Sequence, residues 1–116
     1  MLSKQCYIII NIANWPATRK DHWFTLLKAR AIENQVFIIG VNRTGIDGNN
    51  LFYQKSSIIY SPNGEPLKPL KPYFKLREFD IFEIDLSIVD KIRSAFPMQN
   101  DKKGELYARW YKDFRR

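Results

Sequence analysis

Apolar and polar positions follow two different patterns in the first part of this chain. Residues 7–12 and 36–41 are nearly continuous apolar runs rich in isoleucine, which is typical of strands buried on both faces. Between the two runs, apolar residues recur with a helical period, which predicts a helix that ends near Asn34 or Gln35. The order strand, helix, strand indicates an α/β fold.

The second half of the chain is predicted to contain shorter elements. Residues 52–60 and 78–86 have the composition and alternation of strands, and residues 87–96 are predicted to form a helix that Pro97 terminates. Residues 44–50 are rich in glycine, asparagine and aspartate, so they are predicted to form a loop. The pattern contains no internal repeat and indicates a single domain.

Two polar residues lie where the first predicted helix should be apolar. Arg30 and Asn34 fall close to Trp23 on a helical wheel, inside the apolar stripe, and Glu33 lies three residues after Arg30. Polar groups that face a core are costly unless they are paired or hydrogen-bonded. We therefore interpret Arg30 and Glu33 as a buried structural ion pair, with Asn34 beside it. In this interpretation the cluster fixes how the helix docks on the sheet. The alternative is that they line a catalytic pocket.

The composition is that of a globular chain. The sequence has 116 residues, 45% of them hydrophobic and 15% aromatic, which argues against a disordered protein. A single cysteine excludes an internal disulfide and a cysteine-cluster metal site, and makes the cytoplasm the expected location. The apolar run at residues 7–12 is too short to span a membrane.

The positive charge is concentrated at the carboxyl end. The net charge is +7, and residues 102–116 contribute six lysines and arginines against Glu105 and Asp113, so 6 − 2 = +4. The rest of the chain is only mildly basic. A basic, aromatic tail of this kind could contact nucleic acid or a protein partner.

Several motifs occur in a fixed order along the chain. They are Ala-Asn-Trp-Pro at 13–16, the helical run at 27–35, Gly-Val-Asn-Arg at 40–43 and Ser-Ser-Ile-Ile-Tyr-Ser-Pro-Asn-Gly-Glu at 56–65. Together they resemble the second half of the nitrilase, or carbon–nitrogen hydrolase, superfamily, and most of all its omega-amidase-type branch. We divide the chain into a partial hydrolase domain at residues 1–107 and a basic aromatic tail at residues 108–116.

The resemblance implies a fold and a chemistry. The fold would be the carboxyl-terminal portion of a four-layer αββα sandwich. The family hydrolyses small amides or nitriles with a cysteine nucleophile, a glutamate base and a lysine that stabilises the oxyanion. In the family, all three precede the Ala-Asn-Trp-Pro-like segment, so this chain is expected to be a truncated enzyme that is inactive alone.

Cys6 does not fit the role of that nucleophile. It lies only seven residues before Ala13, the family's following Tyr-Asp is here Tyr7 and then isoleucine, and five residues upstream cannot supply the glutamate and lysine. We interpret Cys6 as a small buried hydrophobic residue and assign no catalytic residue. His22, the only histidine, is interpreted as a solvated helix residue. No metal site and no cofactor are predicted.

Asn14 and Trp15 are the candidate substrate-binding residues. They follow a buried strand directly and precede a helix, which is where open α/β sheets place ligands. The alternative is a purely structural turn with Trp15 packed beneath it. Both interpretations remain open at this point.

Two functional hypotheses follow. In the first, the chain is part of an amidase whose substrate is a small-molecule amide, and its partner is a complementing amino-terminal fragment or a second copy in a homo-oligomer. In the second, it is a non-catalytic basic binding module that uses its tail. We expect no membrane association, and the second hypothesis rests on charge alone, which makes nucleic acid the weaker choice of partner.

Overall fold

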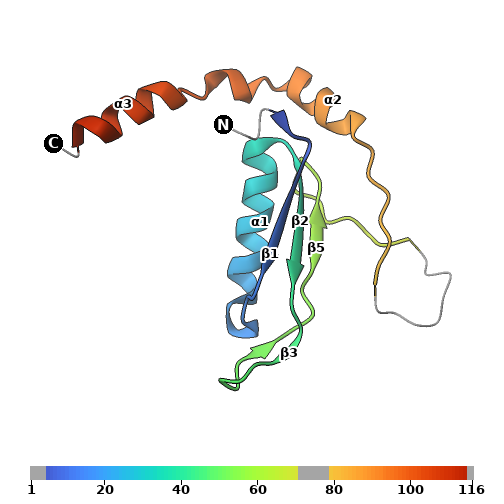
Figure 1. Cartoon of the computed structure of the whole chain (residues 1–116). Helices are drawn as coiled ribbons and strands as arrows, with labels where there is room; N and C mark the ends of the chain where they lie inside the picture. The colour runs from blue at the N-terminus through green and yellow to red at the C-terminus, as the bar shows by residue number, and fades with distance from the viewer. Residues whose placement is uncertain (1–4, 71–78, 115–116) are drawn as a thin grey trace.

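A three-stranded sheet lies at the centre of the molecule (Figure 1). The computed structural model describes residues 5–70 and 79–114. The strands lie in the order β1 (Ile8–Ala13), β2 (Phe37–Asn42) and β5 (Ile58–Tyr60). β1 and β2 are parallel and are joined by α1 (Lys20–Asn34), whereas β5 is antiparallel to β2. The strands predicted at residues 7–12 and 36–41 are confirmed, each shifted by one residue toward the carboxyl end. The helix between them ends at Asn34, as predicted.

The helix α1 covers one face of this sheet. Trp23, Leu27 and Ala31 are buried at intervals of four residues and pack against Ile38 and Tyr60. With a step of about 100° per residue, this spacing places the centre of the buried stripe at Leu27 rather than at Trp23. The stripe therefore lies further round the helix than the sequence analysis assumed.

A close approach between helix and sheet occurs at Gly40 in β2. A Cβ atom at this position would clash with the Leu27 side chain and would lie 2.9 Å from Cζ2 of Trp23. The large side chains of α1 therefore occupy the space that any other residue of β2 would need. This contact fixes the height of α1 above the strand.

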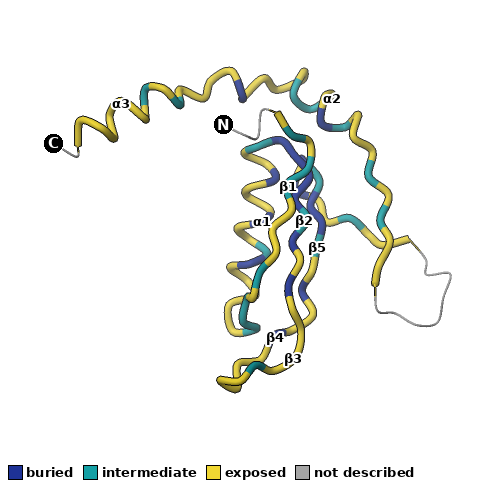
Figure 2. Tube along the Cα trace, viewed as in Figure 1, coloured by how far each residue is buried: buried dark blue, intermediate teal, exposed yellow. Residues whose placement is uncertain are grey.

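The opposite face of the sheet is covered only in part. Phe37 and Ile59 are buried there against Val89 of α2 (Ser87–Ala95), and Phe82 lies partly buried beside them. Further along the strands, Ile10, Ile12 and Val41 remain exposed on this face. Figure 2 shows the exposed stretch of β1 beside the buried residues of β2.

The predicted strand at residues 78–86 is only partly testable, because residue 78 lies outside the described residues. Residues 79–86 form no strand, although Leu70 donates a backbone hydrogen bond to the Ile81 carbonyl. The predicted alternation survives in part, since Phe82 and Ile84 face the core while Leu86 is exposed. The segment is extended and packs through side chains instead of pairing along the sheet.

The predicted strand at residues 52–60 is divided in two. Its first part, β4 (Phe52–Tyr53), pairs with β3 (Gly45–Ile46) in a small separate sheet, and its last part is β5. Residues 54–57 between them carry Ser56 and Ser57, whose hydroxyls bond to Asn42 instead of continuing a ladder. The predicted loop at residues 44–50 is otherwise confirmed, with the two-residue strand β3 inside it.

The carboxyl-terminal segments extend away from the sheet. After α2 come a short 3-10 helix, η3 (Met98–Asp101), and α3 (Gly104–Phe114), which arches away from the rest of the chain (Figure 1). The Cα radius of gyration is 17.4 Å, compared with about 13 Å for a compact chain of this length. The helix α3 crosses the domain boundary placed at residue 107 and has no buried residue.

The beginning of α2 is held by an acidic residue. The Asp85 carboxylate accepts a hydrogen bond of 2.9 Å from the Ser87 backbone N–H. Hydrogen bonds from the Ser87 side chain and backbone hold the pKa of Asp85 below its ordinary value. The helix predicted at residues 87–96 is confirmed and ends one residue earlier, at Ala95.

No helix among the described residues is both long and apolar enough to cross a membrane.

The predicted burial of the Arg30 cluster is wrong. Arg30 and Glu33 do form an ion pair of 2.7 Å, but their side chains are 60% and 54% exposed. Asn34 is half-buried and does not join the pair; its side chain donates to the Arg30 carbonyl and accepts from Lys102. Because the buried stripe centres on Leu27, Arg30 lies beyond its edge, and an exposed pair does not fix the docking of α1.

The substitution Arg30→Ala is therefore expected to lower the free energy of unfolding by less than about 1 kcal/mol, as for other exposed ion pairs. Urea denaturation followed by circular dichroism measures the change. A loss of several kcal/mol would restore the interpretation as a buried ion pair.

The substitution Gly40→Ala is expected to cost roughly 1–3 kcal/mol, because the added methyl group must displace Leu27 or Trp23 in a packed core. Gly48 is the matched control, since a Cβ atom there meets nothing within 4 Å. Equal urea midpoints for Gly40→Ala and Gly48→Ala would contradict the close approach.

Candidate functional site

Asn14 and Trp15 lie at the carboxyl end of β1, as the sequence predicted, and Asn42 at the end of β2 holds them there. The Asn42 side chain accepts a hydrogen bond of 2.7 Å from the Trp15 backbone N–H and donates one of 2.8 Å to the Trp15 carbonyl. One buried amide therefore satisfies both backbone groups of Trp15. The turn after β1 is fixed to the neighbouring strand by this clamp.

Two serines extend the clamp to the segment before β5. Asn42 donates a further bond of 2.9 Å to the Ser56 hydroxyl, and its backbone N–H donates to the Ser57 hydroxyl at 3.0 Å. The Ser56 carbonyl accepts a bond of 2.8 Å from the indole N–H of Trp23 on α1. One partly buried polar network thus joins the ends of β1 and β2 to α1 and to the segment before β5.

Trp15 itself is half-buried and packs within the chain. Its ring lies 5.6 Å from that of Trp23, and its indole N–H donates to the Arg19 carbonyl at 2.5 Å. The Arg19 guanidinium lies 5.3 Å from the Trp15 ring centroid, within the range of a cation–π contact. These contacts support the structural interpretation for Trp15, while the exposed Asn14 retains a side chain that a ligand could reach.

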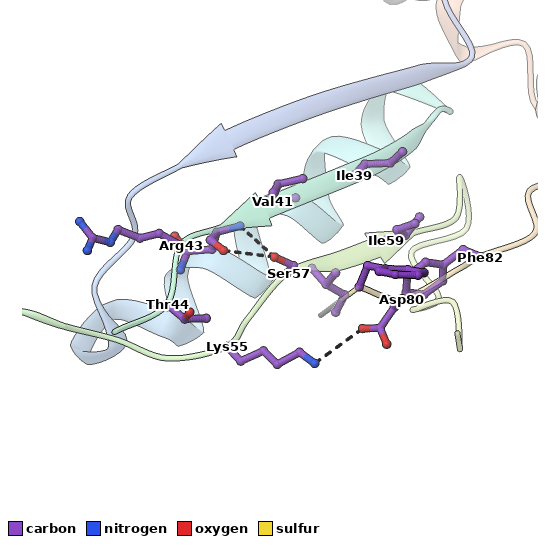
Figure 3. Close-up of a pocket in the computed structure, with 13 residues that line it drawn as sticks. Ile39, Val41, Arg43, Thr44, Lys55, Ser57, Ile59, Asp80 and Phe82 are labelled. Carbon is purple, nitrogen blue, oxygen red and sulfur yellow. Dashed lines mark hydrogen bonds and ion pairs between the residues drawn. The ribbon is translucent and has the colours of Figure 1, made fainter. Parts of the chain in front are cut away.

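A cavity of about 790 Å³ opens on the sheet face opposite α1 (Figure 3). Its floor is apolar, with Ile39, Val41, Ile59 and Phe82 among the lining residues, and its rim is polar. The polar lining residues are Asn42, Arg43, Thr44, Lys55, Ser57 and Asp80. At the rim, Lys55 and Asp80 form an ion pair of 3.8 Å, which contributes little because both side chains are well exposed.

Asn14 and Trp15 do not line this cavity. The residue pattern therefore indicated the turn, but it indicated neither the cavity nor Asn42, which belongs to both. Asn42 could have been recognised in the sequence as the one polar residue that follows directly on the apolar run at residues 36–41. The Asn-Trp-Pro turn follows the other apolar run in the same way. Partial cover of the second sheet face, which forms the cavity, has no such sequence signal.

A second polar cluster holds the loop after β2. The Tyr53 hydroxyl donates to the Asp47 carboxylate at 2.9 Å, and the Arg43 guanidinium lies 4.6 Å from the Tyr53 ring centroid. The backbone hydrogen bond from Leu51 is the main cause that lowers the pKa of Asp47, and the hydrogen bond to Asp47 raises the pKa of Tyr53. The Arg43 guanidinium thus lies over Tyr53, and Figure 3 shows this side chain pointing away from Asp80 and Phe82 on the far side of the cavity.

Cys6 and His22 are not among the residues that line the cavity. Cys6 is half-buried beside the core under α1, and its carbonyl accepts a bond of 2.9 Å from Arg93. His22 is exposed on α1 and contacts Arg19. Within the described residues, no group of three histidine, cysteine, aspartate or glutamate side chains could hold a metal ion.

The family model described as carbon–nitrogen hydrolase matches residues 1–93. Among curated proteins, the chain is 41% identical over 102 residues to "Hydrolase in agr operon" of Staphylococcus aureus, covering 86% of this chain and 37% of that protein. It is 38% identical over 94 residues to "Omega-amidase YafV" of Escherichia coli K12, covering 81% and 36%. It is 38% identical over 107 residues to "2-oxoglutaramate amidase" of Bacillus subtilis, covering 90% and 39%.

Solved structures agree with these sequence relationships. The chain superposes on the CN-hydrolase superfamily protein XC1258 of Xanthomonas campestris with a TM-score of 0.69 and 32% identity, covering 86% of this chain and 37% of that one. It superposes on the Caenorhabditis elegans NitFhit protein with a TM-score of 0.67 and 27% identity, covering 90% and 25%. The chain therefore spans about two fifths or less of the length of these relatives.

Replacing Asn42 by alanine is expected to lower the free energy of unfolding by roughly 1–3 kcal/mol, because two backbone groups of Trp15 lose their buried partner. Asn11→Ala is the control, since Asn11 is exposed on β1. Urea denaturation compares the two variants. Indistinguishable midpoints would mean that the clamp contributes nothing to the fold.

Proposed function

Because the chain belongs to the carbon–nitrogen hydrolase family, we propose that it is the carboxyl-terminal portion of an amidase that acts on ω-amides of small dicarboxylic acids. The observation that carries the proposal is the 38% identity over 107 residues to 2-oxoglutaramate amidase. The alignment covers 90% of this chain, so the similarity is not confined to one motif.

The chemistry divides between this portion and the remainder of such an enzyme. Hydrolysis of an amide by a cysteine needs a thiolate, a base and groups that stabilise the oxyanion. Cys6 lies beside the core without the sequence context of the family nucleophile. This portion would instead supply substrate contacts. Asn14 is exposed at the end of β1, and its side-chain amide can both donate to and accept from a substrate amide.

The uncovered sheet face supports a four-layer architecture for the complete enzyme. One face of the sheet is covered by α1, whereas Ile10, Ile12 and Val41 are exposed on the other. β1 and β2 form a parallel pair, and parallel strands are normally covered on both faces of their sheet. The remaining portion of the enzyme would supply that cover as a second sheet, so a complementing amino-terminal fragment is the expected partner.

A non-catalytic role remains a second candidate, and α3 is the observation that favours it. Tyr107, Trp110, Tyr111 and Phe114 recur at helical spacing, and between 52% and 90% of each is exposed. Arg109 and Lys112 lie on the same helix. An exposed aromatic helix with basic residues fits a protein or nucleic-acid partner, and salt-dependent binding to single-stranded nucleic acid would distinguish this role.

The 116-residue protein alone is expected to have no measurable turnover of 2-oxoglutaramate, since Cys6, the only cysteine of the sequence, lies half-buried beside the core and lacks the sequence context of the family nucleophile. Ammonia release measures the activity. Turnover by the isolated chain that Cys6→Ser abolishes would identify Cys6 as a nucleophile and overturn the proposal.

Co-expression with the portion of the Escherichia coli relative that lies outside the aligned 94 residues is expected to produce amidase activity. The positive control is the relative divided at the same point, which tests whether divided halves can reassemble. Activity from the control pair together with a bound but inactive pair containing this chain would argue against a role in catalysis. Asn14→Ala in an active pair is expected to raise the KM for the amide.

A further inference from the structure

We propose that Arg43 is a specificity-determining residue, which binds the free carboxylate at the far end of an ω-amide substrate. Such a substrate carries an amide at one end and a carboxylate at the other, and only the amide reacts. A neutral amide of the same length lacks the second group. The inference rests on the proposed amidase function and adds the residue that would recognise the unreactive end.

The position of Arg43 follows from the topology of the sheet. β1 and β2 are parallel, so their carboxyl ends lie at the same edge, which is where open α/β sheets place ligands. Asn14 follows β1 and Arg43 follows β2. The Arg43 backbone N–H donates a hydrogen bond of 3.4 Å to the carbonyl of Ala13, the residue before Asn14. Two exposed polar side chains therefore leave neighbouring turns, one suited to an amide and one to a carboxylate.

Contacts within this chain hold the Arg43 side chain in place. Its guanidinium carbon lies 4.6 Å from the centroid of the Tyr53 ring. Tyr53 is buried, and its hydroxyl donates a hydrogen bond of 2.9 Å to the Asp47 carboxylate. A guanidinium that rests on an aromatic ring is already ordered, so less side-chain freedom is lost when it binds a ligand. This placement, and not the exposure of Arg43, carries the inference.

The Asp47 carboxylate beside Arg43 is bonded to other groups. Its Oδ1 atom accepts hydrogen bonds of 2.8 and 3.0 Å from the backbone N–H groups of Asn49 and Leu51. Its Oδ2 atom accepts the bond from Tyr53. Both oxygens therefore bond to the loop and to Tyr53, and Asp47 orients the platform under Arg43 without forming an ion pair with it.

The chemistry of a guanidinium matches that of a carboxylate. Its planar N–H groups can donate two parallel hydrogen bonds to the two carboxylate oxygens, which a lysine cannot reproduce. A second guanidinium strengthens the local positive potential. Arg19 ends η2 (Ala17–Arg19), which lies against β4, and its guanidinium lies 5.3 Å from the ring centroid of Trp15. A positive potential around Asn14 favours a substrate with an anionic end.

Substrate selectivity in the co-expressed pair tests the proposal. The two probes are glutaramate and pentanamide, which has a methyl group in place of the carboxylate. Arg43→Gln is expected to lower kcat/KM for glutaramate about 10-fold to 100-fold, mainly through KM, and to change it far less for pentanamide. Arg43→Lys keeps the charge without the planar N–H groups, so its value for glutaramate is expected to lie between those of the wild type and Arg43→Gln.

Arg30→Gln is the matched control, because it removes the same charge from an exposed site on α1. It is expected to leave kcat/KM for both amides unchanged. An equal loss for glutaramate and pentanamide in Arg43→Gln would overturn the proposal, since a purely structural role affects both substrates alike.

A binding experiment on the 116-residue protein does not require turnover. Nitrogen-15 NMR observes the Nε–H groups of the arginines, and Arg43→Lys identifies the signal of Arg43. Glutaramate is expected to shift that signal, whereas pentanamide is expected to leave it in place. The signal of Arg30 serves as an internal control, and circular dichroism establishes that each variant is folded. No shift at Arg43, or an equal shift at Arg30, would overturn the proposal.

The two experiments separate failure of this proposal from failure of the proposed function. A pair that assembles but hydrolyses neither amide would contradict the amidase function alone, and the NMR titration would still decide whether Arg43 binds the carboxylate. An active pair in which Arg43→Gln retains the full preference for glutaramate would support the amidase function and overturn the role of Arg43.

Discussion

The contact between α1 and β2 at Gly40 is the constraint on which the rest of the structure depends. Only a residue without a side chain lets Trp23 and Leu27 lie directly on the strand. At that height the Trp23 indole reaches the Ser56 carbonyl, and this bond draws the segment before β5 toward the helix. The packing of one apolar stripe thus determines where the polar network at the strand ends can form.

The polar network around Asn42 fixes the turn that follows β1. Asn42 is buried and makes three side-chain hydrogen bonds, two to Trp15 and one to Ser56. Buried amides are tolerated when their groups are satisfied, and they then specify one arrangement. Asn14 is exposed directly beside this clamp, so the bonds to Trp15 also fix where the backbone of Asn14 lies.

The sequence predicted the elements whose periodicity is set locally. The apolar runs of β1 and β2 and the end of α1 follow from the residue pattern, and the predictions were correct to within one residue. The error at Arg30 came from centring the buried stripe on Trp23, when the strand lies under Leu27; that offset is decided by the Gly40 contact and cannot be obtained from the helix alone. The strand predicted at residues 52–60 is confirmed only at its two ends, β4 and β5. It is interrupted between them because Ser56 and Ser57 bond to Asn42, a tertiary effect that overrides strand propensity.

The segments after α2 are attached to the end of α1 by side-chain hydrogen bonds that the local sequence pattern does not indicate. Gln35 and Gln99 tie the end of α1 to the segment after α2, through bonds to the Phe96 and Asn34 carbonyls. These bonds fix the position of η3 relative to α1. The helix α3, which follows η3, has no buried residue. Since the uncovered face of the sheet and α3 are both apolar in part and both unburied, the chain contains more interaction surface than it can satisfy internally. Among the described residues, α2 and the segment that carries Phe82 cover only part of the second face, and the extended shape accompanies this incomplete cover.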